Sequence, residues 1–440
     1  MRTMTHDFMP SRRDCRVVTA VVWGLATSRC AWAAPPPRPV VVMTSFQDEL
    51  VSRFEAAFEK AYPAYRLQVI WRMPHDAAPY LRQPAQGGVD VYWAASPRTF
   101  AGLARDGVWR KLPVDRTGLP GRIGNTPLAD SEGYYTATEM AGFGFAIAPA
   151  ALAARKLPVP ADWSDLADPQ LTGQIALPIP ARVGFAPPIV EIVLQAYGWE
   201  RGWALWSQIA ANAVLVDRGA TFVTDEVGSG RCAIGVSIDF FVNSAIANGA
   251  PLGFVYPRHT GLNPAHAAIT ASSPNPAGAR AFVDFLLSQA GQKMLAHPDI
   301  RRLPVRPSAY EGLPEGYFNP FAAAAAGQLQ FDGEAARPRL GLSSALFQQM
   351  LVLPHDELKA LWQRIRVAEA GGKPVAQARR RLETPPLTEV QAADEALRRQ
   401  FANRLEGSEA PQMSALETGW QQFCREQRDA ARRILDEACA

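Results

Sequence analysis

The stretch that decides the fold is Val40–Trp71, VVVMTSFQDELVSRFEAAFEKAYPAYRLQVIW. Val40–Met43 is a short β-rich run, and Leu67–Trp71 is a second one. Between them, the apolar residues of Phe46–Tyr62 recur at helical spacing and would share one face of a helix. Ser45 and Asp48 resemble a capping box at its start. The order strand, helix, strand indicates an open α/β sheet.

The same alternation continues through the first three quarters of the chain. We predict buried strands followed by helices, the strands at Val89–Trp93, Gln174–Leu177 and Cys232–Ser237. Helices are expected from the loop at Ala94–Pro97 to about Asp106, over Gly184–Tyr197 with two prolines in the opening turn, over Trp199–Ala210, and over Asp239–Asn248 with Asp239 as the cap.

The last stretch, about 335–440, differs from the rest in composition. It is rich in Ala, Arg, Glu and Gln, and it shows long helical periodicity with few strand signals. We therefore predict a C-terminal helical extension. We expect it to pack on one lobe of the sheet protein and to be dispensable for ligand binding.

The N-terminus has the order of a secretory signal peptide. Basic residues, Arg12, Arg13 and Arg16, precede the short apolar run Val17–Ala26, and small residues follow at the A-x-A spacing Ala31–Ala33. The run is shorter than the roughly 20 apolar residues that span a bilayer. We predict that residues 1–33 form a signal peptide, cleaved near Ala33, and that the protein is exported to the periplasm by an export pathway that the sequence leaves open.

Charge and cysteine content exclude several classes of protein. Residues 1–33 hold five arginines and two acidic residues, so the remaining chain has a net charge near zero. Such a balance argues against a nucleic-acid partner. Cys232, Cys424 and Cys439 have no metal-ligand spacing, and a bridge to Cys232 and unpaired thiols both remain open, with unpaired thiols favoured. We predict no cofactor and no metal centre, and we expect a monomer.

Four strand-to-helix loops carry the candidate ligand-binding residues. In open α/β sheets, ligands lie beyond the carboxyl ends of strands, where helix N-termini offer free N–H groups. The candidates in these loops are Thr44, Ser45, Ser96, Arg182, Gly184, Ser237 and Asp239. Hydroxyls and a guanidinium there would suit an anionic or hydroxylated ligand. The alternative is that these residues only cap helices.

Other patterns favour structural roles. Trp199, Trp203 and Trp206 lie at helical spacing, which could form a stacking platform but is more typical of core. The sequence contains no H-E-x-x-H, G-x-S-x-G, P-loop or dinucleotide fingerprint, so we predict that the protein is not an enzyme.

Several segments resemble bacterial extracellular solute-binding proteins of ABC transporters, in the ferric-ion, sugar-phosphate and phosphoglycerate group, and most closely the phosphoglycerate-transport branch. They include VDVYWAASP, DPQLTGQIALPIP, YGWERGWALWS, AIGVSIDFF and NPAGARAFVDFLLSQAGQ, within about residues 39–310. The resemblance implies a two-lobed α/β periplasmic-binding-protein fold of type II-like architecture that closes about a hinge. Lobe 1 would combine 39–140 with 265–330, lobe 2 would span 141–264, and the helical extension 335–440 would follow. Glu139, before the first crossing, is a weaker cleft candidate, for which we favour a solvated surface carboxylate.

Two departures from the family pattern bear on the ligand. Adjacent tyrosines of ferric-binding relatives correspond to Phe240 and Phe241, whose rings offer no oxygen to a hard cation. The Ser-Gly-Thr of phosphate-binding relatives is replaced by Val183–Phe185, which removes two hydroxyls. We expect a small organic anion, with Arg182 as its main charge partner, delivered to an ABC permease. The alternatives are a ligand-sensing regulator of a membrane sensor kinase and a ferric-ion-binding protein.

Overall fold

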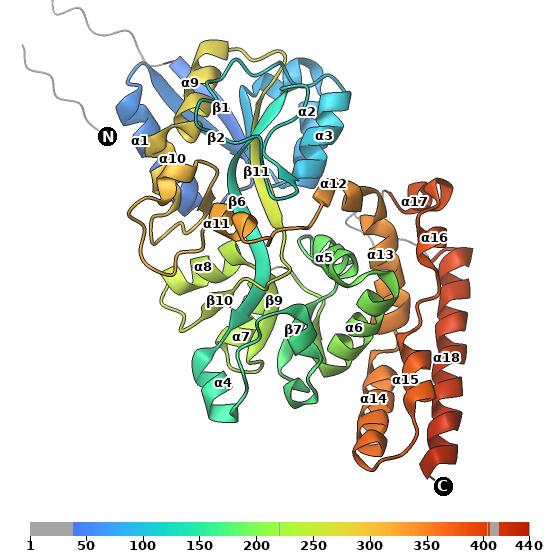
Figure 1. The fold of residues 1–440 in the computed structure, drawn as a ribbon. Coiled ribbons are helices and arrows are strands. Elements are labelled where there is room, and N and C mark those ends of the chain that lie inside the picture. Colours follow the sequence, from blue (N-terminus) through green and yellow to red (C-terminus); the bar gives the residue numbers. More distant parts are fainter. Residues whose placement is uncertain (1–37, 220, 403, 405–412, 440) are drawn as a thin grey trace, which may run out of the picture. The chain divides into compact units, whose positions relative to one another are not determined.

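The computed structural model describes residues 38–219, 221–402, 404 and 413–439, so the predicted signal peptide lies outside the described residues. These residues belong to one compact unit, Pro37–Ala440. Its main sheet has the strand order β2-β1-β3-β11-β6-β9-β7-β8, and β10 and β12 also pair with β6 (Figure 1). The predicted α/β fold with a helical C-terminal region is confirmed.

We call lobe 1 the half of the sheet that contains β1, β2, β3 and β11, together with its helices. Its strands β1–β3 are parallel, and β11 is antiparallel to β3. The elements are β1 (Arg38–Thr44), α1 (Asp48–Ala61), β2 (Tyr65–Trp71), α2 (Pro74–Leu81), β3 (Val91–Ala94), α3 (Pro97–Arg105), the hairpin β4 (Arg122–Ile123) and β5 (Thr126–Pro127), β11 (Leu262–Ile269), α9 (Pro276–Leu287), α10 (Gln289–Leu295), β12 (Leu303–Pro304) and α11 (Pro320–Ala325).

We call lobe 2 the half that contains β7, β8 and β9. Strand β7 is parallel to both β8 and β9. The elements are α4 (Pro149–Arg155), β7 (Ile175–Pro178), α5 (Pro187–Tyr197), α6 (Trp199–Asn212), β8 (Ala213–Val216), α7 (Thr221–Gly228), β9 (Ile234–Ile238), α8 (Asp239–Ala247) and β10 (Gly253–Val255).

Strand β6 (Tyr135–Ile147) runs unbroken through both halves. Its first part pairs with β11, and its second part pairs with β9 and β10. The lobe boundaries expected from the sequence, 140/141 and 264/265, fall inside β6 and β11. The two halves are therefore joined by strand backbone, which places residues of β6 against both lobes.

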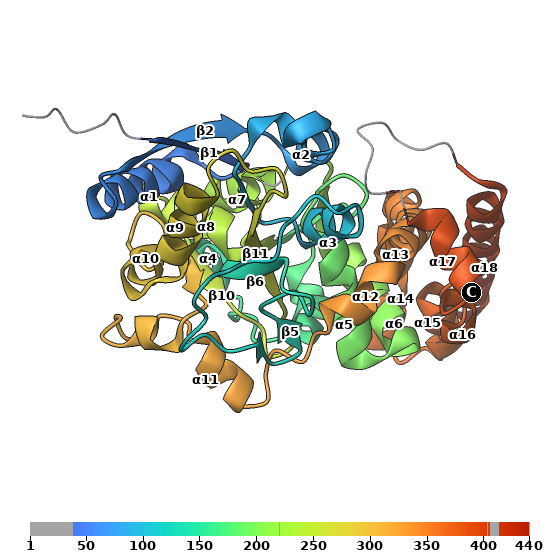
Figure 2. The same ribbon diagram turned by 90° about the horizontal axis from the view of Figure 1, so that it is seen from above.

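The extension covers one side of lobe 2. It comprises α12 (Gly333–Ala336), α13 (Leu340–Phe347), a π-helix (Gln348–Val352), α14 (His355–Ala370), α15 (Ala376–Glu383), α16 (Glu389–Ala392), α17 (Glu395–Phe401) and α18 (Ala415–Cys439). Both views show the extension on the side of lobe 2 that carries α5 and α6, with α18 at its outer edge (Figures 1 and 2). Lobe 2 and the extension share one hydrophobic core, which contains Trp203, Trp206, Phe347 and Trp362.

The predicted core position of the tryptophan stripe is confirmed, since Trp199, Trp203 and Trp206 are at most 3% exposed. The two predicted caps are wrong. Helix α1 begins at Asp48, after an N-cap residue whose side chain makes no cap bond. Asp239 is the first helical residue of α8, behind the N-cap Ile238. Its carboxylate is used elsewhere, as described below.

Cys232 and Cys424 are free and buried, as expected for unpaired thiols. The side chain of Cys439 lies outside the described part of the structure. No helix in the described ranges is both long enough and apolar enough to cross a membrane.

Candidate functional site

A cluster of three charged side chains lies buried where β6 joins the two lobes. Arg302 is 5% exposed, Glu139 is 1% exposed and Asp239 is fully buried. Arg302 directly precedes β12, whose residues pair with Met140 and Glu139 of β6, and Asp239 opens α8 of lobe 2. Lobe 1, lobe 2 and the crossing strand each contribute one charge. We call these residues the interlobe charge cluster.

The guanidinium of Arg302 lies between aromatic rings of the two lobes. Its carbon Cζ is 4.5 Å from the ring centre of Phe46, which follows β1, and 4.8 Å from that of Phe240 in α8. Each such contact contributes about 0.5–2 kcal/mol. The guanidinium forms no hydrogen bond or ion pair with any residue that the structure describes. Burial lowers the pKa of Arg302, and the nearby charges of Glu139 and Asp239 act in the opposite direction.

Only one carboxylate oxygen of Glu139 is hydrogen-bonded to a described residue. The indole N–H of Trp93 donates to its Oε2 (3.2 Å) and to Thr138 Oγ1 (3.1 Å). Glu139 Oε1 is buried and has no donor among the described residues. Burial raises the pKa of Glu139, and the positive charge of Arg302 opposes this rise. The expectation of a solvated surface carboxylate at Glu139 is therefore wrong.

Asp239 ties the start of α8 to β6. Its Oδ2 accepts from the backbone N–H of Gly142 and from the hydroxyl of Tyr256, both at 2.8 Å. Asp239 Oδ1 is buried without a donor in the described ranges. Burial raises the pKa of Asp239 to about 7, although these hydrogen bonds and Arg302 favour the ionised form. Gly142 is needed for this approach, because a Cβ there would lie 2.5 Å from the ring of Tyr256.

The backbone before Arg302 is strained. Arg301 has a φ of +47°, in the left-handed region that residues with a Cβ seldom adopt. Its carbonyl oxygen accepts from the side-chain amide of Asn243 in α8, at 3.0 Å. Conformations of this kind persist where the surroundings enforce them, and they concentrate at functional sites. The strain and the contact with lobe 2 together position Arg302 at the junction.

Some of the predicted site residues lie in or next to this cluster, and others do not. Glu139 and Asp239 belong to it, and the buried Ser237 lies two residues before Asp239 in β9. Thr44 is buried at the end of β1, and its Oγ1 accepts from the N–H of Phe46 at 3.1 Å. Ser45, which is partly buried, therefore lies next to the residue that stacks on Arg302.

In the described part of the chain, the other predicted residues form no hydrogen bond or ion pair with the cluster. Ser96 is the N-cap residue of α3, and its hydroxyl is bonded to that of Thr99 at 2.7 Å. Arg182 and Gly184 are exposed in the loop between β7 and α5. That helix begins at Pro187, three residues after the predicted Gly184. Within the described residues, the guanidinium of Arg182 has no hydrogen-bonding or ionic partner, and its backbone N–H donates to Ile179 O at 2.9 Å.

Sequence reasoning missed Arg302, Phe46, Trp93 and Tyr256. Arg302 stands in Ile300–Val305, IRRLPV, where a basic pair is ordinarily solvated. The one available signal is that the second arginine directly precedes the apolar Leu303–Val305, of which β12 is part. Pairing of β12 with the crossing strand, which buries Arg302, is a long-range event that local patterns do not report.

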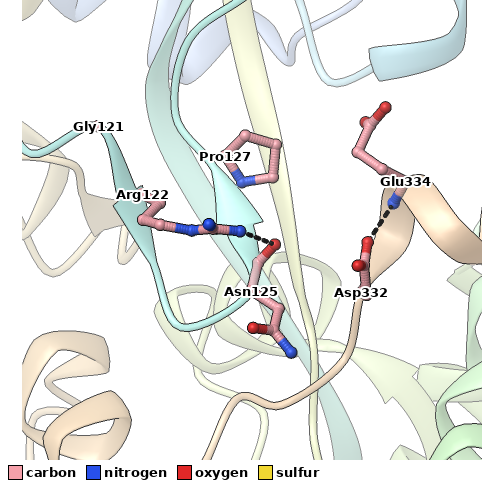
Figure 3. Close-up of a pocket in the computed structure, with 6 residues that line it drawn as sticks. All are labelled: Gly121, Arg122, Asn125, Pro127, Asp332 and Glu334. Carbon is pink, nitrogen blue, oxygen red and sulfur yellow. Dashed lines mark hydrogen bonds between the residues drawn. The ribbon is translucent and has the colours of Figure 1, made fainter.

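A separate hollow of about 540 Å³ lies on another part of the molecule (Figure 3). It is lined by residues of the β4–β5 hairpin and of the start of the extension, namely Gly121, Arg122, Asn125, Pro127, Asp332 and Glu334. None of these belongs to the interlobe charge cluster. Among the described residues, no group of three or more His, Cys, Asp or Glu side chains is arranged to hold a metal ion.

Residues 100–318 match the family model of bacterial extracellular solute-binding proteins. The chain belongs to this family. The phosphoglycerate transport regulatory protein PgtC of Salmonella typhimurium is 32% identical over 278 residues, which are 61% of this chain and 66% of that protein. The chain thus spans just under two thirds of the length of this relative.

Solved structures of periplasmic binding proteins share the fold. AfuA from Actinobacillus pleuropneumoniae, with exogenous fructose-6-phosphate bound, has a TM-score of 0.56 at 18% identity, covering 72% of this chain and 99% of AfuA. Iron-bound HitA from Pseudomonas aeruginosa has a TM-score of 0.53 at 17% identity, covering 69% of this chain and all of HitA. At these identities the likeness concerns the fold alone.

Proposed function

We propose that the chain is an exported periplasmic solute-binding protein that captures a small organic anion between its lobes and delivers it to an ABC importer. The observation that carries this proposal is Arg302, a buried cation held between rings of the two lobes, with no anionic partner within ion-pair distance among the residues that the structure describes. Buried charges are ordinarily paired. A ligand anion would complete the coordination of this guanidinium.

The two carboxylates support a ligand that also carries hydroxyl groups. Glu139 Oε1 and Asp239 Oδ1 both lack donors among the described residues, and the charge of Arg302 acts to lower the pKa of both carboxyl groups. A hydroxylated anion would offer an acceptor to the guanidinium and donors to these oxygens. A fully anionic ligand would be repelled by both carboxylates. Phosphorylated hydroxy acids and sugar phosphates meet the requirement, in line with the phosphoglycerate named for PgtC and the fructose-6-phosphate bound to AfuA.

We assign the main charge contact to Arg302 and keep Arg182, Gly184, Ser96, Ser45 and Thr44 as candidates at the rim. Arg182 is exposed, so its interactions are weakened by water and salt. The guanidinium of Arg302 is desolvated and preorganised by two rings. Ferric binding finds no support at Phe240 and Phe241, because phenyl rings supply no oxygen ligand.

A second candidate function is ligand sensing on behalf of a membrane sensor kinase. It is favoured by the relative PgtC, which is described as a phosphoglycerate transport regulatory protein. Both functions use the same interlobe site, and they differ in the membrane protein that receives the loaded form.

The test begins with the ligand. Mass spectrometry of small molecules released from the natively purified protein would identify it, and calorimetry would then compare variants. Arg302→Ala should weaken binding about ten- to a hundredfold, from loss of charge-assisted bonds of about 1.5–3 kcal/mol. Arg433→Ala, at an exposed site on α18, is the matched control. Unchanged affinity in a folded Arg302→Ala protein would refute the assignment, and tight binding of ferric ion would overturn the ligand class.

A further inference from the structure

Residues 329–332 form a third connection between the lobes, beside β6 and β11. Leu329 is 1% exposed in the core of lobe 1, and Phe331 is 6% exposed in the core that lobe 2 shares with the extension. Only Gln330 separates these two buried anchors. Their Cα atoms are therefore at most about 7 Å apart. The connection cannot lengthen further while both anchors stay buried.

The lobe 1 end of the connection is fixed to the β4–β5 hairpin. The backbone N–H of Asn125 donates to Leu329 O (3.3 Å), and its side-chain amide donates to Gln330 O (2.6 Å). Leu329 has a φ of +62°, unusual for a residue with a Cβ. Gly124 permits the contact, because a Cβ there would lie 2.3 Å from Leu329 O.

The lobe 2 end is fixed by α5. The amide of Gln195 donates to Asp332 O (3.0 Å) and accepts from Asp332 N–H (2.9 Å). The ring of Phe331 packs on Gly261, where a Cβ would lie 2.5 Å from the ring. Gly261 directly precedes β11, and its carbonyl oxygen accepts from Phe143 N–H of β6 at 3.2 Å. The third connection thus packs on the residue before β11, and that residue is itself hydrogen-bonded to β6.

Beyond Asp332 the chain stays attached to lobe 2. Arg339 donates to the buried Glu191 of α5 at 2.6 Å, and Ser343 also donates to that carboxylate. The hollow in Figure 3 lies between the β4–β5 hairpin on one side and Asp332 and Glu334 on the other. A rotation of lobe 2 with its extension would have to strain the connection next to this hollow.

We propose that residues 329–332 are a tether that limits how far the two lobes open in the ligand-free protein. Hinge motion in two-lobed proteins is absorbed by the few residues that cross between lobes. A short third crossing, anchored in both cores, removes part of that freedom. It would also raise the fraction of binding-competent protein, and with it the apparent affinity. Only this last effect rests on the proposed solute-binding function.

The tether is tested by measuring the distance between lobes without any ligand. Nitroxide labels are placed on cysteines at two exposed positions, Ala56 in α1 and Ala154 in α4, with Cys439→Ser in the background. Pulsed electron–electron double resonance then reports the distance distribution. The test variant carries Gly-Ser-Gly-Ser after Gln330, which adds up to about 14 Å of reach. The same insertion between Gly371 and Gly372, in an exposed turn of the extension, is the control.

Lengthening the tether should broaden the distribution toward longer distances, and the control insertion should leave it unchanged. An unaltered distribution in the folded test variant would overturn the proposal. If the insertion variant does not fold, Asn125→Ala is the alternative test variant. It removes the side-chain hydrogen bond to Gln330 O of the tether, and it should broaden the distance distribution to a smaller extent. Asn248→Ala is its matched control, because it removes a side-chain hydrogen bond from the C-cap residue of α8 to Ser244 O. A distribution equal to that of this control would likewise overturn the proposal. Because no ligand is used, failure here is distinguishable from failure of the proposed function.

Discussion

Replacing Asp239 by asparagine should remove a pH dependence of stability that burial imposes on the protein. The variant keeps an oxygen to accept the hydrogen bonds from Gly142 and Tyr256, and it lacks the titrating proton. In the folded protein the pKa of Asp239 is raised from 3.8 to about 7, mainly by burial. Between these values the native state binds more protons than the unfolded state. The free energy of unfolding therefore falls as pH rises through this window.

The size of the effect follows from the difference between the two pKa values. A difference of about 3 units corresponds to about 4 kcal/mol between pH 4 and pH 7. His266 works in the opposite direction, because burial lowers its pKa from 6.5 to about 3, so the native state binds fewer protons there. Other groups with shifted pKa values, Glu139 and Glu191 among them, also contribute to the wild-type profile. The quantity to compare is thus the difference between wild type and Asp239→Asn at each pH.

Urea unfolding followed by tryptophan fluorescence and circular dichroism, at several pH values from 4 to 8, measures this difference. The variant should gain stability relative to wild type as pH rises, because its side chain never has to bear a buried charge. Asp225→Asn, at an exposed position of α7, should show no such trend. A wild-type-minus-variant difference that stays constant from pH 4 to pH 8 would refute the reasoning.

Three further predictions concern the extension and the N-terminus. Glu191→Ala should cost about 3 kcal/mol in urea unfolding, because it leaves Arg339 without its buried partner; Glu200→Ala at an exposed position is the control, and equal losses would contradict the argument. A chain ended after Gln330 should fail to form a stable lobe 2, since it uncovers α6 and removes the acceptor of the Trp199 indole; a monodisperse, folded truncation by size-exclusion chromatography and circular dichroism would instead support the dispensability expected from the sequence. Exported protein should begin close to Ala34 by N-terminal sequencing, and an intact N-terminus in the membrane fraction would disprove cleavage.

The sheet could be predicted because its signals are local. The apolar strands that become β1, β3 and β9 are short runs that bury both faces, and α1 and α6 show one apolar stripe each. Helix starts were less predictable. Ser45 and Asp48 match a capping box by spacing, yet the helix begins only at Asp48 and Ser45 lies outside it. The backbone conformation at the end of the strand decides where the helix begins and which residue becomes its N-cap. The spacing of polar residues in the sequence does not report this conformation.

Residues of the candidate site could be predicted only where they lie in a strand-to-helix loop. Asp239 follows a buried strand and was expected to face a ligand, whereas Glu139 lies inside a strand and was expected to be solvated. Arg302 depends on three partners, Phe46, Glu139 and Phe240, that are all more than 60 positions away in the chain. Such distant partners determine whether a charged side chain is buried. The burial of Glu139 and of Arg302 therefore could not be predicted from their neighbours in the sequence.

Lobe 2 cannot complete its core until residues 340–435 have been made. Lobe 1 has all its strands and helices by Ala325, but Trp206 packs its ring against Phe347 at 5.4 Å, and Ser207 accepts from the indole of Trp362. A chain synthesised or threaded across a membrane from its N-terminus therefore exposes the outer face of α5 and α6 for as long as residues 340–435 are missing. In such an incomplete chain, the segment that needs shielding from aggregation is α5 and α6 in the middle of the sequence, and the helices that cover it are made later.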